Sequence, residues 1–134
     1  NKQGYGLEYE PHCTVLYGIQ DEQFNNNFIP KLKTILYPLN SYKVFVENMT
    51  NFKNDEFDVV KFDLDSPELE DMNLALRNNF KYTNDYPVYH PHMTLCYAPP
   101  GKSDHYRTKS FGFVITPRYY VYSRPNGQKL KFKV

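Results

Sequence analysis

Hydrophobic positions repeat along the chain with two different periods. Over residues 28–36 and 69–80, apolar side chains recur every three or four positions, a spacing that predicts two amphipathic helices. Ser66 followed by Pro67 is typical of a helix N-cap and first helical residue, so we expect the second helix to begin there. Pro38 is expected to end the first helix.

Alternation with a period of two, in stretches rich in Val, Tyr and Phe, predicts strands in most of the remaining chain. These stretches cover residues 9–19, 42–47, 57–62, 89–98, 111–115, 118–123 and 129–134. Asn126-Gly127, between the last two, is a hairpin signal. Strands interleaved with two helices indicate an α+β fold, and because no linker divides the chain we expect a single domain over residues 1–134.

Two of the predicted strands carry nearly the same phrase. Residues 9–18 read Y-E-P-H-C-T-V-L-Y-G, and residues 89–98 read Y-H-P-H-M-T-L-C-Y-A. Since side chains alternate along a strand, His12 and Thr14 are expected on one face, as are His92 and Thr94, with apolar residues on the other face. Two such strands would offer a pair of imidazoles and a pair of hydroxyls to one site.

This set of side chains suits acid/base cleavage of a phosphodiester. One neutral imidazole can take a proton from the attacking hydroxyl while the other, protonated, gives one to the departing oxygen. The hydroxyls of Thr14 and Thr94 would hold the nonbridging oxygens, and one such donor is commonly worth about 10²- to 10³-fold in rate. The scheme needs no metal and no cofactor. An attacking ribose hydroxyl would restrict the substrate to RNA-type linkages.

A metal site is the alternative for the same histidines. His90 and His92 form His-x-His on one face of a strand, and zinc usually takes three or four ligands. The candidate ligands are His90, His92, His105, Cys96, Asp104 and His12. The cysteines lie inside the repeated phrases rather than in a disulfide pattern, so we expect free thiols. Cys13 is expected to be buried, and Cys96 to share the face of His92 and line a pocket.

Residues around the two pairs are candidates for substrate binding. They flank the motifs or follow the second motif in a loop: Tyr9, Glu10, Tyr89, His90, Lys102, His105 and Arg107. Tyrosine rings can stack on bases, and loop cations can contact phosphate. Strand phase, however, turns the two tyrosines away from the histidines.

Charge and hydropathy indicate which broad classes of protein the chain does not resemble. Sixteen basic and fifteen acidic residues nearly cancel, which argues against a general nucleic-acid coat, although basic residues gather over 102–133 and acidic ones over 47–71. No apolar run is long enough for a bilayer and no signal-peptide pattern is present. We expect a soluble cytoplasmic monomer that has no obligate protein partner and does not bind membranes.

The motif residues resemble a known family. P-H-C-T-V-L-Y-G at residues 11–18 and P-H-M-T-L at residues 91–95 resemble the two H-x-T signatures of the 2H phosphoesterase superfamily, and the resemblance spans most of the chain. It implies a bilobal α+β fold in which two antiparallel sheets form a central cleft with the helices outside. It also implies metal-independent hydrolysis in which His12, Thr14, His92 and Thr94 act on one phosphate. Only eleven residues precede His12, so we expect the first lobe to be trimmed or completed differently.

The resemblance also implies a substrate class. The stretch G-L-E-Y-E-P-H-C-T-V-L-Y-G is similar to phage members, among them anti-CBASS phosphodiesterases that destroy cyclic-oligonucleotide immune signals. A phage enzyme that cleaves cyclic or short oligonucleotides in the host cytoplasm is therefore expected. The alternatives are a 2′,5′-oligoadenylate phosphodiesterase, a 2′,3′-cyclic phosphodiesterase of RNA repair, a noncatalytic nucleotide-binding module, and a virion or scaffold component with a vestigial site.

Overall fold

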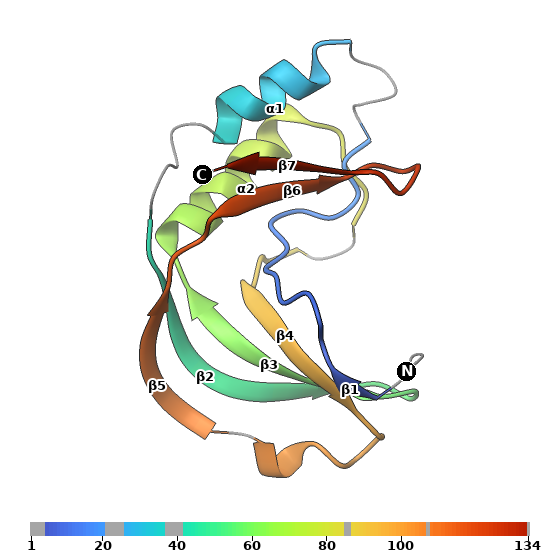
Figure 1. Ribbon diagram of the computed structural model, residues 1–134, viewed down its shortest axis with the longest axis vertical. Coiled ribbons are helices and arrows are strands. Elements are labelled where there is room, and N and C mark those ends of the chain that lie inside the picture. Colours follow the sequence, from blue (N-terminus) through green and yellow to red (C-terminus); the bar gives the residue numbers. More distant parts are fainter. Residues whose placement is uncertain (1–4, 21–25, 37–41, 85–86, 107, 134) are drawn as a thin grey trace.

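The computed structural model describes residues 5–20, 26–36, 42–84, 87–106 and 108–133, with the side chains of residues 108–111 excepted (Figure 1). Within these ranges the protein is α+β, as the sequence predicted. It consists of two α-helices, a five-stranded antiparallel sheet that curls into a half-barrel, and a separate two-stranded sheet. The helices and the small sheet lie together at one end of the curled sheet (Figure 1).

The curled sheet is antiparallel throughout, and its middle strand is β3. Its strands, in spatial order, are β1 (Gly6–Leu7), β4 (His92–Ala98), β3 (Asp58–Asp65), β2 (Val44–Lys53) and β5 (Thr108–Ile115). The small sheet is the hairpin of β6 (Tyr119–Ser123) and β7 (Lys129–Lys133). Its turn contains Asn126-Gly127, as predicted, and Gly127 has the positive φ of +91° that favours glycine.

Both predicted helices are confirmed. α1 spans Phe28–Leu36 and α2 spans Pro67–Asn79. The Ser66 hydroxyl accepts a hydrogen bond from the Leu69 N–H at 3.1 Å, so Ser66 is the N-cap and Pro67 the first helical residue. Pro30 lies in the first turn of α1, where its missing N–H costs no helical hydrogen bond.

The helices, the neighbouring ends of β2 and β3, and the hairpin enclose the core. Its buried side chains include Phe28, Leu32, Val44, Val46, Leu64, Leu69, Met72 and Leu76. Phe28 lies 5.0 Å, centroid to centroid, from both Phe80 and Tyr122, and so links both helices to the hairpin. An isolated two-stranded hairpin is marginal in water, and this packing stabilises it.

The strand predicted over residues 9–19 is wrong. Residues 8–20 form no strand, and their only ladder-like pairing is an isolated bridge between Ile19 and Tyr82. β1 pairs with β4 just before this stretch, and the Glu8 N–H still donates to the Leu95 carbonyl at 2.8 Å. Beyond this point β4 is irregular, because its register shifts between Cys96 and Thr94, and such an irregularity locally disrupts a ladder.

The described part of the chain holds no helix that is both long and apolar enough to cross a membrane.

Candidate functional site

The second motif lies on a strand, as predicted. His92 is the first residue of β4 and Thr94 the third, so their side chains share one face of the sheet, and both are half-buried. Across the ladder, His92 lies opposite Asp63 of β3 and Thr94 opposite Lys61. Met93 turns to the other face and packs against the core.

The first motif is held beside the second by side-chain contacts rather than by a ladder. The Tyr89 hydroxyl donates to the Thr14 carbonyl at 2.8 Å, and the Cys13 thiol lies 3.5 Å from the same hydroxyl. These contacts join residues about 76 positions apart, so the fold brings the two motif segments together.

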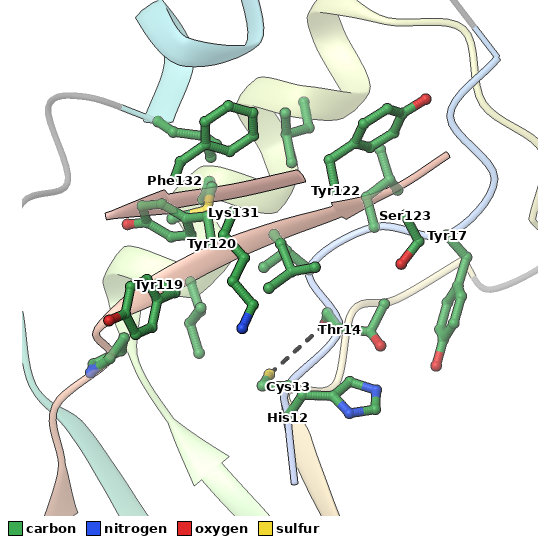
Figure 2. Close-up of a pocket in the computed structure, with 18 of the residues that line it drawn as sticks. His12, Cys13, Thr14, Tyr17, Tyr119, Tyr120, Tyr122, Ser123, Lys131 and Phe132 are labelled. Carbon is green, nitrogen blue, oxygen red and sulfur yellow. Dashed lines mark hydrogen bonds between the residues drawn. The ribbon is translucent and has the colours of Figure 1, made fainter. Parts of the chain in front are cut away.

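The apolar side of the first motif faces the core. Cys13 and Val15 pack against it, as predicted from their phase. Asn73 of α2 donates from Nδ2 to the Val15 carbonyl at 2.6 Å, which ties the segment to the helix. Figure 2 shows the side chains of His12, Thr14 and Tyr17 along the other side of this segment, with Cys13 turned away from them.

Both motif histidines make the same local hydrogen bond. Nδ1 of His12 is 2.7 Å from the Glu10 carbonyl oxygen, and Nδ1 of His92 is 2.9 Å from the His90 carbonyl oxygen. A carbonyl can only accept, so Nδ1 carries the proton in each ring. In the neutral imidazole Nε2 is then the basic nitrogen, and in the imidazolium it is the nitrogen that can donate.

The atoms that would transfer protons or hold a phosphate make no hydrogen bond to the described residues. Neither Nε2 of His12 or His92 nor the hydroxyl of Thr14 or Thr94 has a hydrogen-bond partner there. His12 is exposed, and the other three residues are half-buried. Each motif therefore presents one imidazole nitrogen and one hydroxyl that a ligand can reach.

A cavity of about 1120 Å³ lies between the first motif and the β6–β7 hairpin. Motif residues 10–19 form one wall, the hairpin forms another, and core residues form the floor. Figure 2 shows Tyr119, Tyr120 and Tyr122 on the hairpin side and the Lys131 amine directed toward the motif segment. His92 and Thr94 do not line this cavity, although their neighbour Met93 does.

The candidate binding residues next to the motifs have different surroundings. Tyr89 packs against the core, and burial raises the pKa of its hydroxyl, so its role is to hold the first motif rather than to stack on a base. Tyr9 is 87 % exposed. Glu10 forms an exposed ion pair with Lys129 of β7, at 3.2 Å, across the edge of the cavity. His90 is exposed, and its carbonyl fixes His92.

The candidate residues in the loop after β4 lie at the far end of that strand. Ser103 and Gly101 hydrogen-bond to the buried carboxylate of Asp58, which is opposite Ala98. Ala98 is six positions along the strand from His92, a distance of about 20 Å. Lys102 is exposed in this loop, and His105 stacks on Tyr106, with ring centroids 4.0 Å apart. Neither is brought to the motif histidines, and Arg107 lies outside the described residues.

The structure offers no cluster of ligands for the alternative metal site within the residues that it describes. Within the described ranges, no three His, Cys, Asp or Glu side chains gather closely enough to hold a metal ion. In particular, His105 lies in η3 (Asp104–Tyr106), with the loop at the far end of β4, and does not join His90 and His92.

Cys96 is not placed as the sequence predicted. It lies opposite Val60, whereas Thr94 lies opposite Lys61, and the register shifts between these two neighbours on β3. Adjacent strand residues face opposite sides, so the irregularity breaks the alternation that would put Cys96 with Thr94. Burial raises the pKa of the thiols of both Cys13 and Cys96, which disfavours the nucleophilic thiolate in each.

One polar cluster near the second motif was missed in the sequence. Lys61, Asp63 and Thr50 hydrogen-bond to one another on the face that carries His92 and Thr94. A signal was present, because Lys61 and Asp63 are charged residues that alternate with apolar ones in the middle of the strand. Only the strand register shows that they border the motif.

Comparison with models of protein families and with curated protein sequences gave no match for this chain.

Proposed function

We propose that this protein is a metal-independent phosphodiesterase of the 2H type that cleaves RNA-type linkages in cyclic or short oligonucleotides. One observation carries the proposal. Two copies of one motif each fix a histidine through Nδ1, leave Nε2 and a threonine hydroxyl without a hydrogen bond to the described residues, and are joined to each other through Tyr89. The resemblance to the H-x-T signatures supports the same reading, as does the α+β architecture with two antiparallel sheets.

In this mechanism Nε2 of one neutral imidazole removes the proton from the ribose hydroxyl next to the scissile linkage, which is the 2′-hydroxyl for a 3′,5′ linkage and the 3′-hydroxyl for a 2′,5′ linkage. The oxygen attacks the adjacent phosphorus, the bond from phosphorus to the O5′ leaving group breaks, and Nε2 of the other, protonated imidazole gives its proton to that oxygen. The products are a 2′,3′-cyclic phosphate and a free 5′-hydroxyl. The hydroxyls of Thr14 and Thr94 donate to the nonbridging oxygens, where negative charge grows.

The Nδ1 hydrogen bonds serve this chemistry in both protonation states. A carbonyl acceptor on Nδ1–H fixes the tautomer of the neutral ring and stabilises the imidazolium when it forms. Because the two rings are held alike, either can begin as the base, and the substrate's orientation selects which one does.

The cavity beside the first motif suits the rest of such a substrate. Its volume of about 1120 Å³ is slightly above the usual range for small-molecule sites. Tyr119 on one wall is exposed and offers aromatic surface for a base, and stacking tolerates any base. Lys131 and Arg118 add positive charge for an anionic ligand. These features favour a short or cyclic oligonucleotide, and we propose a phage immune-evasion enzyme that degrades cyclic-nucleotide signals.

Product analysis in EDTA tests the proposal. Cyclic di- and trinucleotides, 2′,5′-oligoadenylate and a 2′,3′-cyclic mononucleotide are incubated with wild type, His12→Ala and His92→Ala, and the products are identified by chromatography and mass spectrometry. Each histidine variant is expected to lose about 10²- to 10⁴-fold in kcat. The preferred substrate then decides between signal degradation and RNA repair.

A substrate control tests the attacking group. The analogue of the preferred oligonucleotide that is methylated on the attacking hydroxyl, 2′-O-methyl for a 3′,5′ linkage or 3′-O-methyl for a 2′,5′ linkage, keeps the phosphate and bases but has no hydroxyl proton to remove. It should bind and remain uncleaved. Tight binding of the parent compound without turnover by any variant would replace the enzyme with a noncatalytic nucleotide-binding module.

A further inference from the structure

Three polar side chains from β2 and β3 form a closed hydrogen-bonded cluster. The Lys61 ammonium donates to the Thr50 hydroxyl at 2.8 Å and to the Asp63 carboxylate. The Thr50 hydroxyl donates in turn to the other carboxylate oxygen of Asp63, also at 2.8 Å. An ammonium carries three protons. Two are used within the cluster, and the described residues supply no partner for the third.

The strand register puts this cluster next to the second motif. Lys61 lies opposite Thr94, and Asp63 lies opposite His92. Thr50 lies opposite Lys61 on the next strand. Side chains directly opposite each other in an antiparallel pair share a face, with Cβ atoms about 4.5–5.5 Å apart. The ammonium therefore sits one strand away from the threonine hydroxyl that is proposed to hold the phosphate.

The Lys61–Asp63 ion pair is more buried than the stability of the fold requires. The Lys61 and Asp63 side chains are only 18 % and 29 % exposed, whereas Lys53 and Asp104, at the far end of the same sheet, are 50 % and 63 % exposed. Removing two charges from water costs about as much as their attraction returns, so an apolar pair would serve the fold as well. A cation placed beside the motif at this cost points to a ligand.

We propose that Lys61 binds a nonbridging oxygen of the scissile phosphate, with Asp63 and Thr50 as positioning residues that fix its ammonium; this rests on the proposed function of the same site. The threonine hydroxyls are neutral donors, while the phosphate gains negative charge as the ribose oxygen attacks. Lys61 supplies the matching positive charge, and the third ammonium proton is the one that meets the oxygen.

The first test compares Lys61→Met with Lys61→Arg, and with Lys53→Met as the matched control from the exposed pair. We expect Lys61→Met to lower kcat/KM by about 100-fold, in keeping with the loss of one transition-state donor. Lys61→Arg should recover part of the loss because it keeps the charge. Lys53→Met should stay within about twofold of wild type, because exposed pairs contribute little. Thermal melting shows whether each variant is folded.

The Asp63→Asn variant shows whether Asp63 positions the Lys61 ammonium for a ligand or only stabilises the fold. The amide keeps the shape of the carboxylate but releases the ammonium from its ion pair. We expect inorganic phosphate to bind more tightly and kcat to fall, since the cation is less neutralised and less well placed. A structural ion pair would lose stability with no such split between binding and turnover.

A binding measurement keeps this inference separable from the proposed function. Inorganic phosphate is titrated into labelled wild type and Lys61→Met, and the Thr94 amide resonance is followed by NMR. At least about tenfold weaker binding by the variant supports the site even if no oligonucleotide is turned over. Equal affinities, or a folded Lys61→Met that keeps wild-type kcat/KM, would overturn it while leaving the two-histidine mechanism standing.

Discussion

The two copies of the Pro-His-x-Thr phrase have different backbone conformations. The second begins β4 and pairs with β3 in a ladder, while the first runs as an irregular segment fixed by Tyr89, Asn73 and the core. In both, the histidine Nδ1 lies against the carbonyl two residues earlier. The orientation of the imidazole is therefore a property of the local phrase and not of the strand.

The proline of each phrase accounts for the shared orientation of the two histidines. It favours an extended conformation in the residue before it, which is the residue whose carbonyl meets Nδ1 in each copy. It also has no N–H to donate, and β4 starts directly after Pro91, whereas Pro11 lies in a segment that forms no strand. Whether a strand follows depends on a partner, and β3 supplies one only for the second copy.

Removing one threonine hydroxyl at a time tests whether the two copies are equal in function. Thr14→Val and Thr94→Val keep the side-chain shape, and each is expected to reduce kcat by about 10²- to 10³-fold. Steady-state kinetics on the preferred substrate measures this. A large loss at Thr94 with none at Thr14 would mean that the irregular copy does not hold the phosphate.

The irregular copy depends on Gly18 at its end. Gly18 has φ of +77°, and a Cβ there would lie 2.1 Å from the Thr83 carbonyl oxygen. We expect Gly18→Ala to lower the free energy of unfolding by more than the roughly 1–3 kcal/mol of backbone strain alone. Gly127→Ala is the control, because φ is +91° but a Cβ would meet nothing within 4 Å. Denaturant unfolding of both variants measures the difference, and equal losses would show that the close approach to Thr83 is unimportant.

The smallest expected effect separates the two tyrosines that occupy the same offset in the phrase. Tyr89→Phe removes the hydrogen bond to the Thr14 carbonyl and should cost about 0.5–1.5 kcal/mol of stability. Tyr9→Phe should change stability little, because Tyr9 is 87 % exposed. Chemical denaturation reports both, and a larger loss for Tyr9→Phe would contradict the placement of the first motif.

Local patterns were enough for the elements that depend on near neighbours in sequence. The N-cap at Ser66, the two helices and the Asn126-Gly127 hairpin formed where the sequence predicted them. Each is fixed by contacts within a few residues. The strand predicted over residues 9–19 is absent. The alternation of polar and apolar residues there indicated which side chains would be buried, but not whether a partner strand was available. Cys13 and Val15 did turn to the core, yet no strand partner exists in that register.

The sequence by itself determined the two Pro-His-x-Thr phrases, the identity of the four groups proposed to act on phosphate, and the local bond that orients each imidazole, because these depend on residues two positions apart. Only the tertiary structure decided that Lys61 and Asp63 stand opposite Thr94 and His92, that the irregularity in β4 removes Cys96 from that row, and that the loop with Lys102 and His105 lies at the far end of the strand. Strand register and loop placement follow from pairing between distant segments, and a one-residue shift reverses which face a side chain occupies.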